Sequence, residues 1–206
     1  MKKINLAVGL WLFAAVAAAV LAGCSKSGEP AAVVQPTTFA GWLDLAQKGR
    51  AEAQYNVGLM YLSGQGVAKD ARAAVGWLAK AAVQNDADAQ FNLGALYAKG
   101  EGVEKNEVEA VRWFEMAAKN GHVAAQNNLG FAYLNGKGVA ADAATAATWF
   151  RKAAEQGDRN AQLQLGECLY VGRGVAADRK EAVEWFKKSA QQGNALAAER
   201  LKVLGL

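Results

Sequence analysis

The amino-acid sequence predicts an all-α fold, a right-handed α-solenoid of four 36-residue helix–turn–helix repeats with a half-repeat cap at each end. Three observations predict it. Four consecutive blocks of equal length align without a gap, most of the 22 glycines recur at the same block positions, and apolar residues within each block follow helical spacing. The four repeats are residues 51–86, 87–122, 123–158 and 159–194.

Two helices are expected in each repeat. In the first repeat, one apolar stripe at helical spacing predicts the first helix, and a second stripe follows a Gly-x-Gly-Val turn. The first stripe is Ala53, Val57, Met60 and Tyr61, and the second is Ala74, Trp77, Leu78, Ala81 and Ala82. A short acceptor side chain that can cap free N–H groups precedes each second helix, namely Asp70, Asn106, Asp142 and Asp178.

Glycine recurs at block positions 8, 14 and 16. The glycine at position 14 suits the left-handed turn that ends the first helix. The glycine at position 8 lies inside that helix, where it costs roughly 1 kcal/mol relative to alanine, so we expect a neighbouring helix to approach closely there. The Trp of the block, or the aromatic residue beside it, would fill the contact. The position-8 glycines are Gly58, Gly94, Gly130 and Gly166.

Half-repeats are expected to close both ends of the stack. Residues 38–50 carry Trp42 and Leu43 at positions that match the second half of a block, so they should form a lone second helix. Residues 195–204 begin like another first helix and would cover the last repeat. Caps of this kind shield the terminal apolar faces of a solenoid. The repeat domain therefore spans residues 38–206.

The first 24 residues have the pattern of an export signal. Lys2 and Lys3 precede an uncharged apolar run, and the stretch ends in Leu-Ala-Gly-Cys. This ending resembles the lipobox of bacterial lipoproteins. The resemblance implies a signal peptide of residues 1–23, cleavage before Cys24, diacylglycerol on the Cys24 thiol, and acylation of its new amino group by a chain such as palmitate. An uncleaved membrane anchor is the alternative, because the apolar run could nearly span a bilayer.

Residues 24–37 are expected to form the lipidated cysteine and a flexible tether, because they contain both prolines of the chain and lack apolar periodicity. Several acyl chains make a stable membrane anchor. By the same resemblance, Ser25 after the cysteine is usual for lipoproteins of the outer membrane. The expected location is the cell envelope, on the inner leaflet of the outer membrane facing the periplasm. Cys168 is then the only other cysteine, so no disulfide is expected.

Each block approximates the pattern A-x-A-Q-x-N-L-G-x-x-Y-x-x-G-x-G-V, then Asp or Asn, then A-x-x-W-F-x-x-A-A-x-x-G, with departures such as Leu169 at the tyrosine position. This pattern is similar to that of the Sel-one-like repeat family, relatives of the tetratricopeptide repeats. The resemblance implies a scaffold or adaptor that binds other proteins along the groove of the superhelix. One branch, the beta-lactamase-like cysteine-rich proteins, carries a disulfide in each repeat. This chain lacks those cysteines.

The first helices are expected to line the concave groove, as in tetratricopeptide stacks. Block position 6 carries an amide in every repeat, and an amide can donate to and accept from a peptide backbone. Positions 5 and 9 vary and include aromatic side chains, which are typical interface anchors. Both sets could instead bond to or pack against neighbouring helices. The predicted partner-binding residues are Tyr55, Asn56, Leu59, Phe91, Asn92, Asn127, Asn128 and Phe131.

The sequence predicts no catalytic residue, no metal site and no cofactor. Metal-ligand spacings and the strand context of phosphate-binding glycine loops are missing from it. His122, the only histidine, is expected to cap a helix or face solvent, and Cys168 to be a buried inert thiol. The formal net charge of +4 falls by two once Lys2 and Lys3 are removed, which leaves no electrostatic footprint for nucleic acid.

The predicted function is that of an envelope-anchored scaffold or adaptor that binds a partner protein. A second hypothesis is a periplasmic immunity protein that neutralises a type-six-secreted toxin, a role known among Sel-one-like proteins. A third is a beta-lactamase-like hydrolase, against which the missing cysteines weigh. Loss of the gene would sensitise cells to one co-encoded toxin under the immunity hypothesis and to none under the adaptor hypothesis.

Overall fold

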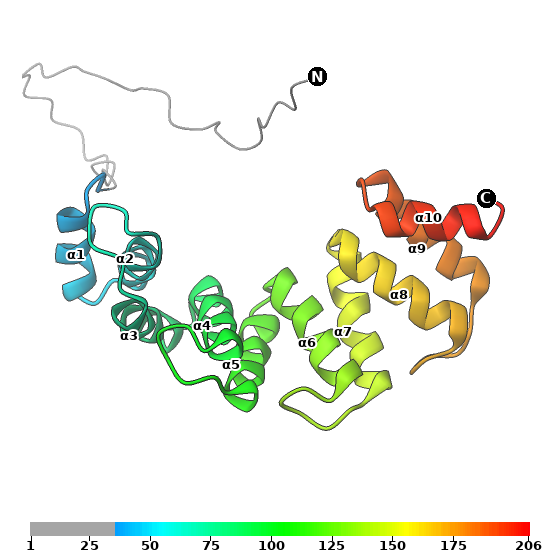
Figure 1. The fold of residues 1–206 in the computed structure, drawn as a ribbon, viewed down its shortest axis with the longest axis horizontal. Helices are drawn as coiled ribbons and strands as arrows, with labels where there is room; N and C mark the ends of the chain where they lie inside the picture. The colour runs from blue at the N-terminus through cyan, green and yellow to red at the C-terminus, as the bar shows by residue number, and fades with distance from the viewer. Residues whose placement is uncertain (1–35) are drawn as a thin grey trace, which may run out of the picture. The chain divides into compact units, whose positions relative to one another are not determined.

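The computed structural model describes residues 36–206, and this part of the chain contains ten α-helices and no strand. Each helix packs against the next one in chain order (Figure 1). The prediction of an α-solenoid of four helix pairs, with a single helix before and after them, is therefore confirmed. The helices are α1 (Phe39–Gln47), α2 (Ala51–Ser63), α3 (Ala71–Ala82), α4 (Ala87–Lys99), α5 (Glu107–Lys119), α6 (Val123–Asn135), α7 (Ala143–Glu155), α8 (Arg159–Val171), α9 (Arg179–Gln191) and α10 (Ala195–Val203).

We call the first helix of each repeat (α2, α4, α6 and α8) an A helix and the second (α3, α5, α7 and α9) a B helix. The predicted signal peptide (1–23), the lipidation site Cys24 and nearly all of the tether (24–37) lie outside the described residues. Among the helices of residues 36–206, none combines the length and the apolar character that a membrane crossing requires. The lipid anchor therefore stays a prediction.

Caps and glycines set the ends of the helices as predicted. The carboxylate of Asp70 accepts a hydrogen bond from the backbone N–H of Ala73 at 3.0 Å, and the equivalent side chains cap the other three B helices. Each A helix ends at the position-14 glycine, which adopts the left-handed conformation, as Gly100 does with φ of 74°. A side chain with a β-carbon rarely adopts this backbone conformation, so glycine is the natural residue to end these helices.

The position-8 glycines lie where each A helix meets its own B helix. A β-carbon built on Gly94 would lie 2.8 Å from the ring of Phe114 and 3.1 Å from the carbonyl oxygen of Ala110. The predicted close approach is confirmed, and the side chain that fills it is the one beside the Trp of each repeat. The four contacts are Gly58 with Leu78, Gly94 with Phe114, Gly130 with Phe150, and Gly166 with Phe186.

The position-16 glycines join one repeat to the previous one. In Gly138, φ is +69°, and a β-carbon there would overlap the backbone carbonyl of Glu107, the first residue of the preceding B helix. Gly102 and Gly174 meet Ala71 and Ala143 in the same way. In the second, third and fourth repeats the turn thus rests directly on the backbone at the start of the previous B helix, and no side chain fits between them.

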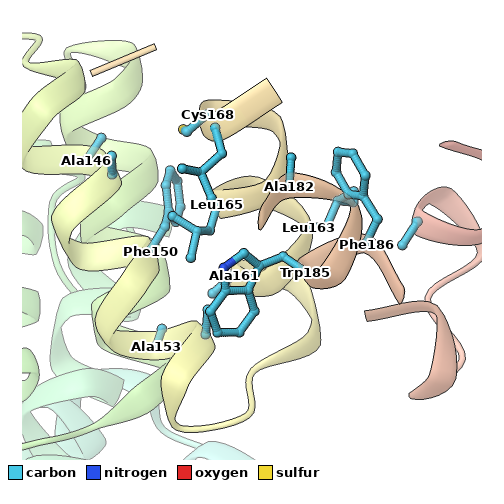
Figure 2. Packing of buried hydrophobic residues seen from close by; sticks show 14 residues of the cluster. Ala146, Phe150, Ala153, Ala161, Leu163, Leu165, Cys168, Ala182, Trp185 and Phe186 are labelled. Carbon is cyan, nitrogen blue, oxygen red and sulfur yellow. The ribbon is translucent and has the colours of Figure 1, made fainter. Parts of the chain in front are cut away.

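The core is divided among neighbouring helices. One cluster joins Leu78 of α3 to Leu93 of α4, and another joins Phe114 of α5 to Leu129 of α6. In the last part of the stack, side chains of α7, α8 and α9 form one cluster that includes Phe150, Leu165 and Phe186 (Figure 2). Because each helix buries its apolar face only against its neighbours, the stability of such a stack is the sum of local interfaces.

Candidate protein-binding groove

A cleft of about 500 Å³ lies between two successive A helices, α4 and α6, with the B helix α5 as its third wall. We call it the α4–α6 cleft. Its volume falls within the range of roughly 300–1,000 Å³ that is usual for ligand pockets. Two of the predicted groove residues, Asn128 and Phe131, line it. The full lining is Ala95, Ala98, Lys99, Lys105, Glu107, Ala110, Val111, Phe114, Asn128, Phe131, Ala132, Asn135 and Lys137.

The charged groups that line the α4–α6 cleft are three lysines and one glutamate. Lys105 forms an ion pair with Glu107, in which Nζ lies 3.2 Å from Oε1. Lys99 and Lys137 have no carboxylate within 4.0 Å among the residues that the structure describes. The lining therefore combines an apolar centre with an excess of positive charge.

The predicted aromatic residues are partly buried and contact neighbouring helices. The ring of Phe91 stacks on that of His122 at a centroid distance of 4.4 Å, and the ring of Phe131 meets Phe150 edge-on at 5.2 Å. Each of these side chains keeps some exposed surface. These two rings therefore pack against neighbouring helices, as the alternative interpretation expected. Part of each ring is still available to a partner.

Tyr55 and Leu59 of α2 are also partly buried. The Tyr55 hydroxyl lies 3.5 Å from Nδ2 of Asn92, at the limit of a hydrogen bond. Burial raises the pKa of this hydroxyl, and the carboxylates of Asp88 and Asp86 raise it further. Tyr55 therefore stays a neutral hydrogen-bonding group over the whole range of physiological pH.

The amides at block position 6 bond to their own helices. Nδ2 of Asn56 donates to the carbonyl of Glu52, and Nδ2 of Asn92 donates to the carbonyl of Asp88, both at 2.9 Å. Their carbonyl oxygens stay available, and Asn128 lies in the wall of the α4–α6 cleft. Apart from the 3.5 Å contact of Asn92 with Tyr55, these hydrogen bonds of Asn56 and Asn92 lie within their own helices.

A second row of amides, at block position 4, connects the repeats instead. Nε2 of Gln90 donates to the backbone carbonyl of Ala82 at 2.9 Å, and Oε1 of Gln90 accepts from Nδ2 of Asn120 at the same distance. Sequence reasoning missed this role, although the signal was present as a glutamine at the fourth position of every block. The buried row is Gln54, Gln90, Gln126 and Gln162, and each bonds to the carbonyl eight residues before it and to an amide thirty residues after it.

Asn127 differs from the other predicted groove residues because it is only 8% exposed. Its Oδ1 has no hydrogen-bond partner among the described residues. Tyr55, Phe91 and Leu163 occupy the same block position in the other repeats. We leave Asn127 out of the proposed contact surface.

Replacing Asn127 with leucine is expected to stabilise the fold by about 1 kcal/mol, because it removes a buried acceptor that has no donor. The midpoint of urea unfolding measures this change. Asn128→Leu is the control, since its side chain is partly exposed, and it should leave the midpoint unchanged. A lower midpoint for Asn127→Leu would mean that the side chain makes a bond through water or a partner.

The Sel1 repeat family model matches residues 51–86, 87–122, 123–158 and 159–194, which are the four predicted repeats with the predicted boundaries. The chain belongs to the Sel1 repeat family. Membership explains why glycine, glutamine and the capping residues recur at fixed positions, since each position serves the same contact in every Sel1 repeat. The Sel1 repeat scaffold suggests a role in protein–protein interaction.

Solved structures of other Sel1 repeat proteins are similar. One of them is c5321, a protective antigen present in uropathogenic Escherichia coli strains that displays an SLR fold. It is 39% identical to this chain with a TM-score of 0.78, and the match covers 79% of this chain and 35% of that chain. A Sel1 repeat protein from Oxalobacter formigenes is also 39% identical, with a TM-score of 0.70, and the match covers 77% of this chain and 63% of that chain. The chain thus spans less than two thirds of the length of either relative. A comparison with curated proteins gave no match.

The immunity protein Pa5087 from Pseudomonas aeruginosa has a similar fold. It is 22% identical with a TM-score of 0.50, over 78% of this chain and 59% of that chain. At this identity the likeness concerns the arrangement of the helices alone.

The single histidine of the Sel1 repeats caps a helix, one of the two roles expected for it. Nδ1 of His122 accepts from the backbone N–H of Ala125 at 3.1 Å, and Nε2 lies 3.3 Å from Oδ1 of Asp88. Residues 36–206 contain no group of three or more His, Cys, Asp or Glu side chains that could hold a metal ion. The hydrogen bond to Ala125 gives His122 a structural role as the N-cap of α6.

Cys168 is buried in the last Sel1 repeat, 3% exposed, and forms no disulfide. Burial raises the pKa of its thiol, so the reactive thiolate is scarce at neutral pH. We expect 5,5′-dithiobis(2-nitrobenzoate) to leave Cys168 unmodified in the folded Cys24→Ser variant at pH 8 and to modify it fully in 6 M guanidinium. Absorbance at 412 nm follows the reaction, and rapid modification of the folded chain would contradict the inert role.

Proposed function

We propose that this Sel1 repeat protein is an envelope-anchored scaffold that binds a partner protein along its A helices, chiefly in the α4–α6 cleft. The α4–α6 cleft is the main support for this function. It lies between the A helices of two successive repeats, where the predicted residues Asn128 and Phe131 stand in its wall. A protein surface of this kind, with aromatic side chains beside polar groups, is typical of interfaces.

The rigid setting of the cleft supports the same proposal. Gln90 and Gln126 bond α4 and α6, the A helices beside the cleft, to the B helix before each of them. Gly102 and Gly138 hold the turns after these helices against the previous repeat. The walls of the cleft are therefore fixed before a partner arrives, so little conformational entropy is lost on binding. Partly exposed Phe131 and Asn128 supply an apolar anchor and a backbone-bonding amide on the same helix.

Photo-crosslinking tests this function. We expect p-benzoylphenylalanine at position 128 of the full chain to give a crosslinked product with one partner protein in cells. The same group at position 83 serves as the control, because Val83 is 67% exposed at the end of α3 and does not line the cleft. Products of equal mass and yield from both positions, or none from position 128, would contradict binding in the cleft.

The anchor forms part of the proposal. The Leu-Ala-Gly-Cys ending supports lipidation of Cys24, and Ser25 supports a place on the inner leaflet of the outer membrane, facing the periplasm. A tether of residues 24–37 would then let the repeats reach a partner near the membrane. Cells supplied with labelled palmitate should label the full chain and not its Cys24→Ser variant.

The immunity hypothesis concerns the identity of the partner. It is motivated by the fold shared with the immunity protein Pa5087, which supports it only as an alternative. Deletion of the gene separates the two roles. An adaptor should leave the sensitivity of the cell to every single secreted toxin unchanged, whereas an immunity protein should protect against one.

A further inference from the structure

We propose that the α4–α6 cleft binds an acidic segment of the partner protein, in which one bulky apolar side chain is flanked by Asp or Glu residues. This inference rests on the proposed protein-binding function and adds the chemistry of the partner. It is carried by two independent features of the cleft, its hollow centre and its lysines.

The hollow exists because α4 and α6 have alanine at three block positions where the other A helices have larger residues. Ala95 and Ala98 stand at block positions 9 and 12, and Ala132 of α6 stands at position 10. All three line the cleft. The equivalent residues in the other repeats are Leu59, Phe131 and Glu167 at position 9, Leu62, Leu134 and Tyr170 at position 12, and Met60, Leu96 and Cys168 at position 10.

The centre of the hollow is apolar. Val111 and Phe114 of α5 are 6% and 7% exposed, and Phe131 of α6 is held edge-on against Phe150 at a centroid distance of 5.2 Å. A bulky apolar side chain that enters from solvent would cover Phe131 and contact the three alanines. Because burial of apolar surface is favourable, a side chain of leucine size fits this centre better than a polar one.

The lysines determine the charge of the partner. Lys99 and Lys137 line the cleft without a described carboxylate partner, and Lys105 is already paired with Glu107. The block position of Lys99 holds Ser63, Asn135 and Val171 in the other repeats, and that of Lys137 holds Gln65, Glu101 and Arg173. Two basic side chains at these positions of successive repeats therefore occur in this cleft alone. Carboxylates on either side of the entering apolar side chain would meet these two ammonium groups, and complementary charge of this kind favours the matching partner.

Fluorescence anisotropy of short labelled peptides tests the inference with the full chain. The probe is a ten-residue peptide with one leucine between two pairs of acidic residues. The comparison peptides carry lysine in place of each acidic residue, or serine in place of the leucine. We expect the acidic leucine peptide to bind at least tenfold more tightly than either comparison peptide, and to bind more weakly as salt is raised.

Variants of the chain place the binding in the cleft. The double variant Lys99→Glu, Lys137→Glu should weaken binding of the acidic peptide at least tenfold. Because both lysine side chains are exposed, we expect its melting curve to match that of the wild type. Ala98→Leu, which restores the residue of two other repeats, should weaken it by filling the hollow, with a melting curve to verify folding. Lys69→Glu is the control for the reversal of charge, because Lys69 is also an exposed lysine and lies outside the cleft.

Each other outcome overturns the inference. Equal binding of the basic and acidic peptides would show that the lysines do not select the partner by charge. Full binding of the acidic peptide by both cleft variants would show that it binds elsewhere than in the cleft. Displacement of the peptide by decanoate at equal concentration would identify the cleft as a site for a free acyl chain. Absence of peptide binding at 1 mM, together with a crosslinked partner at position 128, would reject the acidic segment and leave the proposed protein-binding function standing.

Discussion

Replacing Gly94 with leucine is expected to lower the free energy of unfolding by more than about 3 kcal/mol. The contact between α4 and α5 leaves no room for a side chain, since even a β-carbon would lie 2.8 Å from the ring of Phe114 and 3.1 Å from the carbonyl of Ala110. Phe114 is itself 7% exposed and cannot turn away into solvent. The two helices must therefore separate, and the α4–α6 cleft would lose one of its walls.

Thermal unfolding followed by circular dichroism measures this effect, with Gly76→Leu as the matched control. Gly76 also lies inside a helix, α3, and a β-carbon built there meets nothing within 4 Å. The control should keep or raise stability by up to about 1 kcal/mol, because leucine favours helix more than glycine does. If Gly94→Leu melted like the wild type, the close packing of A helix on B helix at this position would be refuted.

Replacing Gln90 with glutamate is expected to cost about 3 to 5 kcal/mol of stability at pH 7. Gln90 is fully buried, and its Nε2 donates to the carbonyl of Ala82 at 2.9 Å. An ionised carboxylate at this position would lie against a carbonyl oxygen in the core, with no donor to replace the lost bond. The connection between the first and second repeats would be the part most weakened.

The same variant should depend on pH in a defined direction. Burial raises the pKa of the new carboxyl in the folded state above the ordinary value near 4.3. Below about pH 4 the acid is protonated in both states and can donate to Ala82, so the stability should be close to that of the wild type at the same pH. As pH rises above this value the variant loses stability. Gln65→Glu, on an exposed loop residue, should show neither effect.

The fold could be predicted almost completely from the sequence, because its signals are local and repeated. Position-14 glycines end helices through their own backbone conformation, and residues such as Asp70 cap helices through bonds to the next turn. Neither signal depends on distant parts of the chain. Four aligned copies also reveal each signal four times, and the family match has the same boundaries.

The groove was harder to predict because exposure depends on contacts between repeats. Positions 4 and 6 both carry amides, and only the packing of one repeat on the next shows that Gln90 is buried while Asn92 is partly exposed. Asn127 was predicted to lie in the groove from its variable position, yet it is buried without a partner for its Oδ1. The cleft itself arises from three small side chains, Ala95, Ala98 and Ala132, which attract no notice one at a time.

The grouping of Lys99 and Lys137 could not be predicted from the sequence for the same reason. Lys99 ends α4 and Lys137 follows α6, so 38 positions of the chain separate two side chains that line one cleft. The net charge of the whole chain, formally +4, does not reveal their grouping. Local charge, not net charge, determines which partner a protein surface attracts.

Hydrogen–deuterium exchange of the full chain, with and without the partner protein that position 128 captures, measures whether the A helices form the binding groove. We expect slower exchange on binding in residues 95–99 of α4 and in residues 128–137, which cover the end of α6 and the turn after it, with little change in the B helices α3 and α9. Protection confined to those B helices, with α4 and α6 unaffected, would contradict a groove formed by the A helices.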